Sequence, residues 1–565
     1  MRILLFTLLS TFSLFAQTTD PLVSIDYQAQ ESWVDSTFTS LTLEEKIGQL
    51  FMVMTFSEQG EKHFDKISKN IVEDNIGGVI FSLGGPHGQT EWLNKFQKKS
   101  KVPLLIGMDA EWGVAMRLDS VQAFPWNMTL GAIQNDVLVK DIGHRIGEQA
   151  KRLGIHINFA PSVDINTNPK NPIIGNRSFG EDKQNVARKG IAFMQGMHEA
   201  GILSSAKHFP GHGDTATDSH LGLPSINFSM ERIKEVELYP FKEIINAGVS
   251  SVMVAHLDIP AIDAGIPSSL SQKTVQTLLQ DSLQFKGLII TDALNMKGAS
   301  GISPKYGIDV SAFLAGNDIL LIPNDVSVAI KKMKRAFKAK KITEQRLAHS
   351  VKKILKAKYL VGLNNNKEIS SEFLSDNLNT NKDDYLIAKA MQAAITVVQN
   401  KNNVLPLEKT TTYGYLKLGD DTGLDFRNSL SKEIKLHRVN ESLSNSEIIS
   451  NLKDYEKIII GFHRSNNNPW KASSFSKKEI QLISELAKSH TIILDVFVKP
   501  YALSKINTLE GIDGLVVSYQ NNIPAQIASA DILLGDRKAT GKLPVSISSS
   551  FPVGMGIELN GPTKI

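Results

Sequence analysis

The sequence predicts an α/β protein with an N-terminal (β/α)8 barrel of the TIM type, followed by a smaller α/β/α sandwich domain. Three observations lead to this prediction. Eight short apolar runs lie between residues 48 and 323, and segments of helical periodicity separate them. Such strands are typical of a parallel sheet that is covered on both faces, and eight units suggest a closed barrel. Finally, 565 residues are too many for one ordinary domain.

Each predicted barrel strand is a short run of mostly apolar residues. The eight runs are 50–54, 78–82, 104–109, 155–163, 203–208, 251–257, 288–292 and 319–323. Helical periodicity is clear in the segments between them, for example at 231–247 and 273–283. We therefore assign residues 30–362 to the barrel.

The composition changes after Gly362. Residues 363–384 are rich in Asn, Ser, Lys and Asp, which is typical of a linker between domains. A helix at 385–394 then leads into the second domain, which we place at 385–560. Its predicted strands are 413–418, 457–462, 492–498 and 514–518, and a helix is predicted at 477–488. Strands alternating with helices predict an open three-layer sheet.

Composition and charge exclude several classes of protein. Hydrophobic residues make up 42% of the chain and charged residues 21%, as in well-packed globular proteins. The formal net charge of +4 is close to neutral at this length, and no polybasic stretch suits nucleic acid as a partner. Because cysteine is absent, disulfides, thiol chemistry and a lipid-bearing cysteine are excluded.

Residues 1–16 have the pattern of a cleavable signal peptide. Arg2 supplies a positive charge, residues 3–15 are apolar with small hydroxylic interruptions, and Ala16 is a small residue suited to cleavage. The apolar segment is too short to span a bilayer, which disfavours the alternative of a retained membrane anchor. We predict a periplasmic or secreted protein, cut after Ala16, without stable membrane insertion.

Residues 207–220 carry the densest group of chemically active side chains. Three His, two Asp and one Lys occur within these fourteen residues. Pro210, Gly211 and Gly213 disfavour a regular helix or an inner strand there, so the side chains lie on a loop that a scaffold can aim at a ligand. We interpret this segment as an active-site loop.

Ionisable residues also lie at the ends of five predicted strands. They are Asp109, Asp164, Lys207 with His208, His256 and Asp292. In a (β/α)8 barrel, catalytic groups come from the C-terminal ends of strands. Any one of these residues could be explained as a helix cap or as part of a solvated loop. That explanation is weak for ionisable residues at all five strand ends together.

Several chemistries can be weighed against these residues. The chain has no P-loop and no glycine-rich turn with dinucleotide spacing, and nothing supports a serine hydrolase. His208, His212, His220, Asp214 and Asp218 could in principle ligate zinc or manganese, but their spacing matches no metal motif. Carboxylate-driven glycosyl transfer is the other alternative. We expect neither a metal nor an organic cofactor.

Several long motifs in the right order resemble glycoside hydrolase family 3, specifically its β-N-acetylglucosaminidase branch. Residues 158–164 and 168–182 resemble the fourth-strand region of that family. Residues 207–213 with 218–220 are similar to the loop that defines the branch. Residues 291–296 resemble the nucleophile segment, and residues 530–545 resemble the closing segment of the second domain. The resemblance covers nearly all of the chain after the predicted leader.

The resemblance implies retaining hydrolysis of terminal β-linked N-acetylglucosamine in two steps. Asp292 would attack the anomeric carbon and form a glycosyl-enzyme, which requires an ionised carboxylate. His220 would act as general acid and then as general base, and Asp218 would orient its imidazole. The alternative for this Asp-His dyad is a structural turn in which Asp218 caps a backbone amide.

The resemblance also implies a set of sugar-binding residues. They are Asp109, Arg177, Lys207 and His208, with Asp164 and His256 as further candidates. A carboxylate can accept two hydroxyl hydrogen bonds, and Arg and Lys donate charge-assisted ones. Each of these residues could instead belong to buried ion pairs that hold the barrel mouth together. Trp112 departs from the family, which usually has glycine at that place.

Other functions remain open at this stage. A β-glucosidase or β-xylosidase of the same family would take its acid from the second domain, and substrate-assisted hexosaminidase chemistry would not need Asp292. A catalytically silent carbohydrate-binding protein is a further alternative. Because a neutral histidine repels anions less than a carboxylate does, phosphate could replace water in the second step, which product analysis would test.

Two further expectations concern the substrate. We expect terminal N-acetylglucosamine of peptidoglycan fragments to be the substrate, with chitin or other glycan fragments as the alternative source. The loop at residues 463–474, which contains Arg464, Trp470 and Lys471, is expected to approach the barrel mouth.

Overall fold

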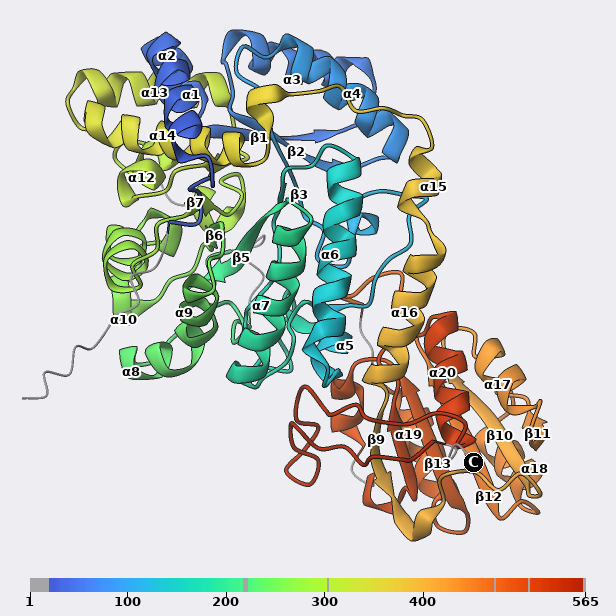
Figure 1. Cartoon of the computed structure of the whole chain (residues 1–565). Helices are drawn as coiled ribbons and strands as arrows, with labels where there is room; N and C mark the ends of the chain where they lie inside the picture. Colours follow the sequence, from blue (N-terminus) through green and yellow to red (C-terminus); the bar gives the residue numbers. More distant parts are fainter. Residues whose placement is uncertain (1–19, 217–221, 302–303, 472–473, 507–508, 562–565) are drawn as a thin grey trace, which may run out of the picture.

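The computed structural model describes residues 20–216, 222–301, 304–471, 474–506 and 509–561 (Figure 1). The predicted leader at 1–16 and the predicted dyad residues Asp218 and His220 therefore lie outside the described residues. Two sheets organise the chain, one of eight strands and one of six. In Figure 1 the first occupies the blue to green part of the chain and the second the orange to red part.

The first sheet is a barrel of parallel strands. Its strands are β1 Phe51–Phe56, β2 Gly78–Leu83, β3 Leu105–Met108, β4 Ile157–Asn158, β5 Leu203–Phe209, β6 Ser251–Val254, β7 Leu288–Thr291 and β8 Leu320–Leu321. They are ordered β7-β6-β5-β4-β3-β2-β1-β8, and the parallel bridge between Ile290 and Ile319 joins the two end strands. This arrangement confirms the predicted (β/α)8 barrel.

The fourth strand is much shorter than the predicted run at 155–163. Only two residues of it form a regular ladder. The chain beyond them stays buried and keeps single contacts: Phe159 N–H donates to the Met108 carbonyl (2.9 Å) and Val163 N–H to the Lys207 carbonyl (2.8 Å). Pro161 lies between these two residues and has no N–H to donate, which interrupts the ladder.

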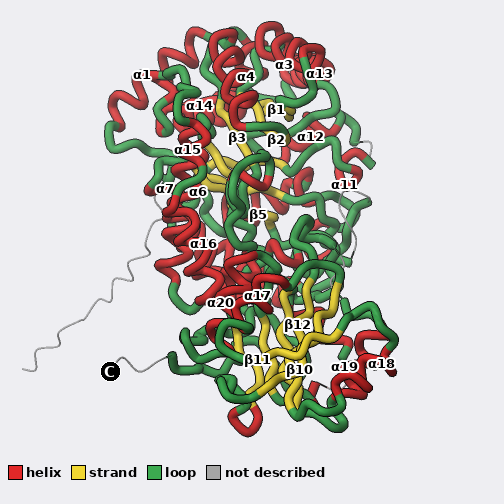
Figure 2. Tube along the Cα trace, turned by 90° about the vertical axis from the view of Figure 1, so that its right-hand side faces the viewer, coloured by secondary structure: helices red, strands yellow, loops and turns green. Residues whose placement is uncertain are grey.

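Helices surround the barrel and connect its strands (Figure 2). They are α1 Tyr27–Ser40, α2 Leu43–Gly48, α3 Glu61–Glu73, α4 Pro86–Lys99, α5 Asn127–Ala132, α6 Asp136–Arg152, α7 Lys183–Glu199, α8 Met230–Arg232, α9 Leu238–Asn246, α10 Pro260–Asp263, α11 Lys297–Ser300, α12 Ile308–Ala315, α13 Val326–Lys338 and α14 Glu344–Leu360. The segments predicted as helical at 231–247 and 273–283 are helical but include π-helical turns, at Ile233–Glu237 and Lys273–Ser282.

Helix α7 illustrates how the sequence sets these elements. Asp182 precedes it, and the Asp182 side chain accepts a hydrogen bond from the amide of Asn185, which caps the first turn. Small residues at Gly190 and Gly196 let α7 approach its neighbours closely, since a Cβ at Gly196 would lie 2.1 Å from the Lys140 carbonyl of α6. The pair α6 and α7 thereby forms one packed layer over β4 and β5.

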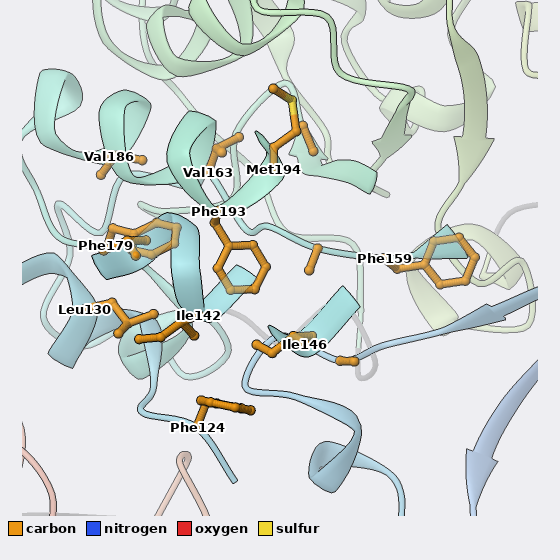
Figure 3. Close-up of a cluster of buried hydrophobic side chains, with 14 of the residues drawn as sticks. Phe124, Leu130, Ile142, Ile146, Phe159, Val163, Phe179, Val186, Phe193 and Met194 are labelled. Atoms are coloured by element: carbon orange, nitrogen blue, oxygen red, sulfur yellow. The ribbon is translucent and has the colours of Figure 1, made fainter. Parts of the chain in front are cut away.

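The core beneath this layer is a cluster of large apolar side chains (Figure 3). Ile142 and Ile146 come from α6 and Phe193 from α7, and each is at most 1% exposed. In Figure 3 they lie near Phe179, on the loop that follows Arg177. Packing of this cluster therefore supports the segment that carries a predicted binding residue.

We expect Ile142→Val to lower the free energy of unfolding by about 1 kcal/mol, because it removes one buried methyl group from this cluster. Val137→Ala on the same helix is the control, since Val137 is 62% exposed and its truncation should change stability by no more than about 0.5 kcal/mol. Urea unfolding followed by tryptophan fluorescence measures both. Equal effects of the two changes would contradict the packing described.

The second sheet has six strands. They are β9 Thr396–Asn400, β10 Thr412–Gly419, β11 Lys435–Val439, β12 Lys457–His463, β13 Thr491–Phe497 and β14 Gly514–Val517. Their order is β11-β10-β12-β13-β14-β9, and β9 pairs antiparallel with β14 while the other pairs are parallel. The four predicted strands correspond to β10, β12, β13 and β14, whereas β9 and β11 were not predicted.

Helices cover the second sheet in two layers. Helix α20 Ile523–Leu533 contacts both α16 Asn381–Ala394 and α17 Leu424–Leu430, and α18 Asn445–Leu452 contacts α19 Lys477–Leu486. This is the predicted α/β/α arrangement. Part of the stretch expected to be a linker is helical, because α15 covers Leu374–Leu378 and α16 begins at Asn381, where Thr380 and Asp383 form a capping box.

The second sheet domain packs against loops at the mouth of the barrel. The Gln520 side-chain oxygen accepts a hydrogen bond from the Trp126 amide (2.8 Å), and the Tyr501 hydroxyl donates to the Asn166 carbonyl (3.0 Å). All four residues are buried. None of the described helices is both long enough and apolar enough to cross a membrane.

Candidate active site

A cavity of about 230 Å³ opens at the C-terminal ends of the barrel strands. Its polar lining comes from the C-terminal end of β5, from residues that follow β3, β5 and β7, and from two connecting loops. These residues are Asp109, Arg117, Arg177, Lys207, His208, His212 and Asp292. The remainder of the wall is apolar and includes four methionines. The cavity therefore lies where a (β/α)8 barrel presents its catalytic groups.

Two carboxylates and three cations form a network in and beneath this cavity. The Lys207 ammonium lies 2.9 Å from an oxygen of Asp109 and 2.9 Å from an oxygen of Glu111. Arg177 donates to both oxygens of Glu111, with a shortest distance of 2.7 Å, and Arg117 pairs with Asp109 at 2.6 Å. Lys207 and Glu111 are each 1% exposed. Charge-assisted pairs of this kind fix side chains in one geometry.

The network lowers the pKa of its carboxyl groups. Burial raises the pKa of Glu111, but the charges of Arg177 and Lys207 and their hydrogen bonds outweigh it and bring the pKa to about 2. Burial also raises the pKa of Asp109, but the charges and hydrogen bonds of Lys207 and Arg117 lower it by more. The pKa of Asp109 therefore lies well below its ordinary value. Both groups are ionised at neutral pH.

We expect the protein to lose stability as the pH falls below the ordinary pKa of glutamate. A folded-state pKa below the unfolded value contributes stability that is complete above the unfolded pKa and is lost as the pH falls toward the folded one. For Glu111 the window runs from about pH 4.5 to about pH 2, and its full loss is worth roughly 3 kcal/mol. Urea unfolding at pH 6, 4.5 and 3.5 measures this loss.

Glu111→Gln is the matched variant for this measurement. It should unfold more easily at pH 6 and should lose less stability than the wild type between pH 6 and 3.5, because one depressed carboxyl group has been removed. Wild-type stability that is constant or rises over this range would contradict the network.

Both ring nitrogens of His208 have a hydrogen-bond partner, which fixes the orientation of the ring. A terminal nitrogen of Arg177 lies 3.1 Å from His208 Nε2, and since a guanidinium only donates, Nε2 must accept. Nδ1 therefore carries the proton and donates to Asp164 at 2.6 Å. Asp164 also accepts from the backbone amides of His208 and His212. An Asp partner thus sets the direction in which His208 faces the cavity.

Asp164 lies beneath the cavity and is not part of its wall. It is fully buried, and its oxygens accept hydrogen bonds from Ser162, from His208 and from the His212 amide. Burial raises the pKa of Asp164, but His208 and His212 lower it by more, so the pKa of Asp164 lies well below its ordinary value. The structure therefore places this candidate sugar ligand where it orients His208.

Asp292 follows β7 directly and faces the cavity. Oδ1 accepts a hydrogen bond from the Ala293 amide (2.8 Å), and Oδ2 makes none with any described residue. Burial raises the pKa of Asp292, but His256, His208, the Ala293 amide and Lys207 together lower it below its ordinary value. The residue is an ionised carboxylate with one oxygen available to a ligand.

His256 supports the segment that carries Asp292. Its Nε2 lies 3.0 Å from the Ala293 carbonyl, which only accepts, so Nε2 donates to it. Nδ1 contacts the Ser269 hydroxyl at 2.6 Å. His256 is fully buried and does not line the cavity. The structure thus places this second candidate sugar ligand behind Asp292.

The loop after β5 is shaped by glycines. Gly211 has φ +132°, and a Cβ at Gly213 would lie 1.7 Å from the Ile165 carbonyl, so larger residues do not fit there. His212 lies between them in the cavity wall, and burial lowers the pKa of its imidazole to about 4. Among the residues that the structure describes, no group of three His, Asp or Glu side chains could hold a metal ion.

The loop after β12 reaches the same cavity. Trp470 lines it, and its indole nitrogen donates to the Ile173 carbonyl at 3.0 Å. The Asn176 side chain donates to the Pro469 carbonyl at 2.9 Å. Both contacts join the second domain to the segment that carries Arg177. The expectation that residues 463–474 approach the barrel mouth is confirmed for Trp470.

Three residues of the site were not assigned from the sequence. Glu111 binds two of the three cations of the network, Arg117 pairs with Asp109, and Met116 belongs to the apolar wall. A signal was present for Glu111 and Arg117, since both lie within eight positions of the strand end at Asp109. Their partners could not be identified without the fold.

Comparisons with known proteins agree with this geometry. The family model described as Glycosyl hydrolase family 3 N terminal domain matches residues 42–357. Beta-hexosaminidase A of Pseudoalteromonas piscicida is 33% identical over 389 residues, which cover 63% of this chain. The match spans 64% of that relative, which is less than two thirds of its length. Beta-N-acetylglucosaminidase/beta-glucosidase of Cellulomonas fimi is 28% identical, over 67% of this chain and 68% of the relative.

Solved structures extend the likeness to both domains. A glycoside hydrolase family 3 β-N-acetylglucosaminidase from Paenibacillus sp. str. FPU-7 is 30% identical, with a TM-score of 0.74, over 90% of this chain and 99% of that chain. The β-glucoside phosphorylase BglX bound to 2FGlc is 23% identical, with a TM-score of 0.80, over 94% of this chain and 98% of that chain, and so shares the fold. Because the family model matches more than half of the 565 residues, the chain belongs to glycosyl hydrolase family 3.

Proposed function

We propose that the protein is a retaining exo-β-N-acetylglucosaminidase that removes terminal β-linked N-acetylglucosamine. One observation carries this proposal: Asp292 is an ionised carboxylate at a barrel strand end, with Oδ2 available to a ligand, in a cavity whose other polar groups are hydrogen-bond donors and acceptors for hydroxyls. The names of the relatives, β-hexosaminidase and β-N-acetylglucosaminidase, support the choice of sugar.

In the first step Asp292 attacks the anomeric carbon of the terminal sugar. A C–O bond forms to the carboxylate, the glycosidic C–O bond breaks, and the leaving oxygen takes a proton from His220. Ionic contacts hold Lys207 and Arg177 rigidly, so their donors need no reorganisation when the sugar binds. The neighbours that depress the pKa of Asp292 keep it ionised for this step.

In the second step water replaces the carboxylate. His220 takes a proton from the water, the oxygen attacks the anomeric carbon, and the bond to Asp292 breaks, which releases the sugar with its original β configuration. Asp218 orients the His220 imidazole in both steps. These two roles rest on the family resemblance of residues 218–220.

Cleavage from the chain end follows from the size of the cavity. At about 230 Å³ it is small, and the Trp470 ring forms part of its wall. A single terminal sugar fits such a site, whereas an internal sugar would need openings on both sides. Asp109, Lys207 and His208 line it as candidate contacts for hydroxyl groups and the acetamido group.

Release of a chromogenic aglycone from β-N-acetylglucosaminide and from β-glucoside, measured in parallel, tests the proposal. We expect release from the acetamido sugar to exceed that from the glucoside. A preference for the glucoside would instead favour a β-glucosidase that takes its acid from the second domain. Binding of N-acetylglucosamine oligomers without release from either substrate would favour a catalytically silent binding protein.

The source of the substrate and the location of the protein are further proposals. The predicted leader at residues 1–16 supports export to the periplasm or beyond. Peptidoglycan fragments supply terminal N-acetylglucosamine in those compartments, and chitin or other glycan fragments are the alternative source. Mass analysis of the exported protein tests the leader, since cleavage after Ala16 leaves Gln17 as the first residue.

A further inference from the structure

A second and larger cavity adjoins the one that contains Asp292. Its volume is about 630 Å³, and it is lined by the barrel loop around Trp112 and by the second-domain loops around Asn467 and Asn522. Met116, Arg117 and Trp470 line both cavities. The two spaces therefore adjoin at the barrel mouth and share part of their wall.

The larger cavity, which we call the interdomain groove, is lined by aromatic and amide side chains. Three tryptophans line it, and the rings of Trp112 and Trp470 meet edge to face with centroids 6.3 Å apart. Six of its side chains are amides, which are Gln122, Asn466, Asn467, Asn468, Gln520 and Asn522. Amides both donate to and accept from hydroxyl and acetamido groups, and indole faces pack against the apolar faces of sugar rings.

Few charged side chains line the interdomain groove, and each of them already has a partner within the protein. Among the described residues that line it, only Arg117 and Asp384 are ionisable. Arg117 pairs with Asp109 at 2.6 Å, and Asp384 accepts a hydrogen bond from Gln122 at 2.9 Å. A ligand with several carboxylates would find no free cation in this lining. The lining suits an uncharged ligand that is rich in hydroxyl and amide groups.

Two amides are available to such a ligand. The Nδ2 group of Asn466 is buried and has no hydrogen-bond partner among the described residues, while its oxygen accepts from the Asn521 amide. The Asn467 side chain is exposed and makes no hydrogen bond within the described part of the chain. Because an unpaired buried donor is costly, a ligand oxygen at Asn466 would be favourable.

We propose that the interdomain groove binds the sugar units that follow the cleaved bond, as an uncharged, peptide-free saccharide. This proposal rests on the proposed β-N-acetylglucosaminidase activity and specifies its leaving group. The groove has more than twice the volume of the cavity assigned to one sugar, about 630 against about 230 Å³, so it has room for two further units. Trp112, at a place where the family usually has glycine, forms part of its wall.

The first test is the dependence of kcat/KM on chain length. With oligomers of two, three and four β-1,4-linked N-acetylglucosamine units, kcat/KM should rise about fivefold or more from the dimer to the longest chain. Asn467→Ala should remove about fivefold for the longer chains and leave an aryl β-N-acetylglucosaminide unchanged. Asn366→Ala is the control, since Asn366 is an exposed amide that lines neither cavity.

A binding measurement separates this proposal from the activity itself. In the Asp292→Asn background, calorimetry with the trimer should show weaker binding when Asn467→Ala is added, by the same factor. If the aryl substrate is not cleaved by the wild type, the proposed function fails. If it is cleaved but all chain lengths give equal kcat/KM and Asn467→Ala has no effect on binding, only the proposal for the groove fails.

The last arm of the test addresses the nature of the leaving group. A disaccharide whose second sugar carries a peptide with free carboxylates should be cleaved at least tenfold less efficiently than the same disaccharide without the peptide. Equal or faster cleavage of the peptide-bearing substrate would overturn the proposal. Peptide-free peptidoglycan strands and chitin oligomers of matched length, compared side by side, then identify which source the groove accepts better.

Discussion

Asp292→Asn is expected to lower kcat/KM for an aryl β-N-acetylglucosaminide by about 10⁴-fold while the protein stays folded. Asparagine has nearly the shape of aspartate but is neither ionised nor nucleophilic, so it cannot form the glycosyl-enzyme. The contact from the Ala293 amide to Oδ1 survives in the variant, because an amide oxygen accepts as well. The loss is therefore one of chemistry, and the thermal midpoint should change little.

Two companion variants sharpen this result. Asp258→Asn is the control, because Asp258 is another carboxylate beyond a strand end, its Oδ1 accepts only from the Gly265 amide, and it does not line the cavity. Asp292→Ala opens space for azide, which should restore turnover and yield the α-glycosyl azide by a single displacement. More than a tenth of wild-type activity in folded Asp292→Asn would contradict the nucleophile role.

Lys207→Met is expected to lower the free energy of unfolding by about 3–5 kcal/mol, because it leaves the buried carboxylate of Glu111 and the half-buried carboxylate of Asp109 without a shared cation. Lys207 lies 2.9 Å from both Asp109 and Glu111, and its side chain is 2% exposed. Its loss should raise the pKa of both carboxyl groups and reduce kcat/KM as well, since the cavity wall would no longer be held in one geometry. Urea unfolding at pH 7 and steady-state kinetics measure the two effects.

Lys352→Met is the matched control for this change. Lys352 pairs with Asp35 at a similar distance, 2.7 Å, but its side chain is 39% exposed, and breaking such a surface pair costs no more than about 1 kcal/mol. The double variant Lys207→Met/Glu111→Gln should cost less than the sum of the two single changes, because the contact between Lys207 and Glu111 is lost in each single variant and is counted only once in the double one. Equal costs of Lys207→Met and Lys352→Met, or costs of Lys207→Met and Glu111→Gln that simply add, would contradict the network.

The fold could be predicted in its main features because most of its strands are short runs rich in apolar residues. All eight barrel strands and four strands of the second sheet were located from such runs. The two strands that were missed lack this signal. β11 is an edge strand that contains Lys, His and Arg and is exposed or half-buried except at its last residue, and β9 follows directly on a helix and contains only two valines in its buried part.

Individual residues of the site could be predicted from the sequence, but the hydrogen-bond and ion-pair partners of these residues could not. Asp292, Lys207 and His208 stood out because each ends a strand, and the structure brings all three to one cavity. Glu111 and Arg177 are 66 positions apart in the chain, and only folding brings them to 2.7 Å. Asp164 and His256 lie beneath the cavity because burial and hydrogen bonds orient them toward protein atoms, which no local pattern reveals.

The interdomain groove shows the same limit at a larger scale. Trp112 belongs to the barrel and Trp470 to the second domain, 358 positions later, and their rings meet only in the folded chain. The sequence did indicate that the loop carrying Trp470 reaches the barrel mouth. It did not indicate that this loop and the barrel enclose a space larger than the cavity around Asp292.

Trapping of the covalent intermediate tests the proposed mechanism most directly. The wild type would be incubated with a slowly turned over 5-fluoro derivative of β-N-acetylglucosaminyl fluoride, and the mass of the intact protein and of its peptides would be measured. We predict one added glycosyl group, on the peptide that contains Asp292 and on that residue. A label on another carboxylate, or turnover without any adduct and with participation of the acetamido group, would contradict a nucleophilic Asp292.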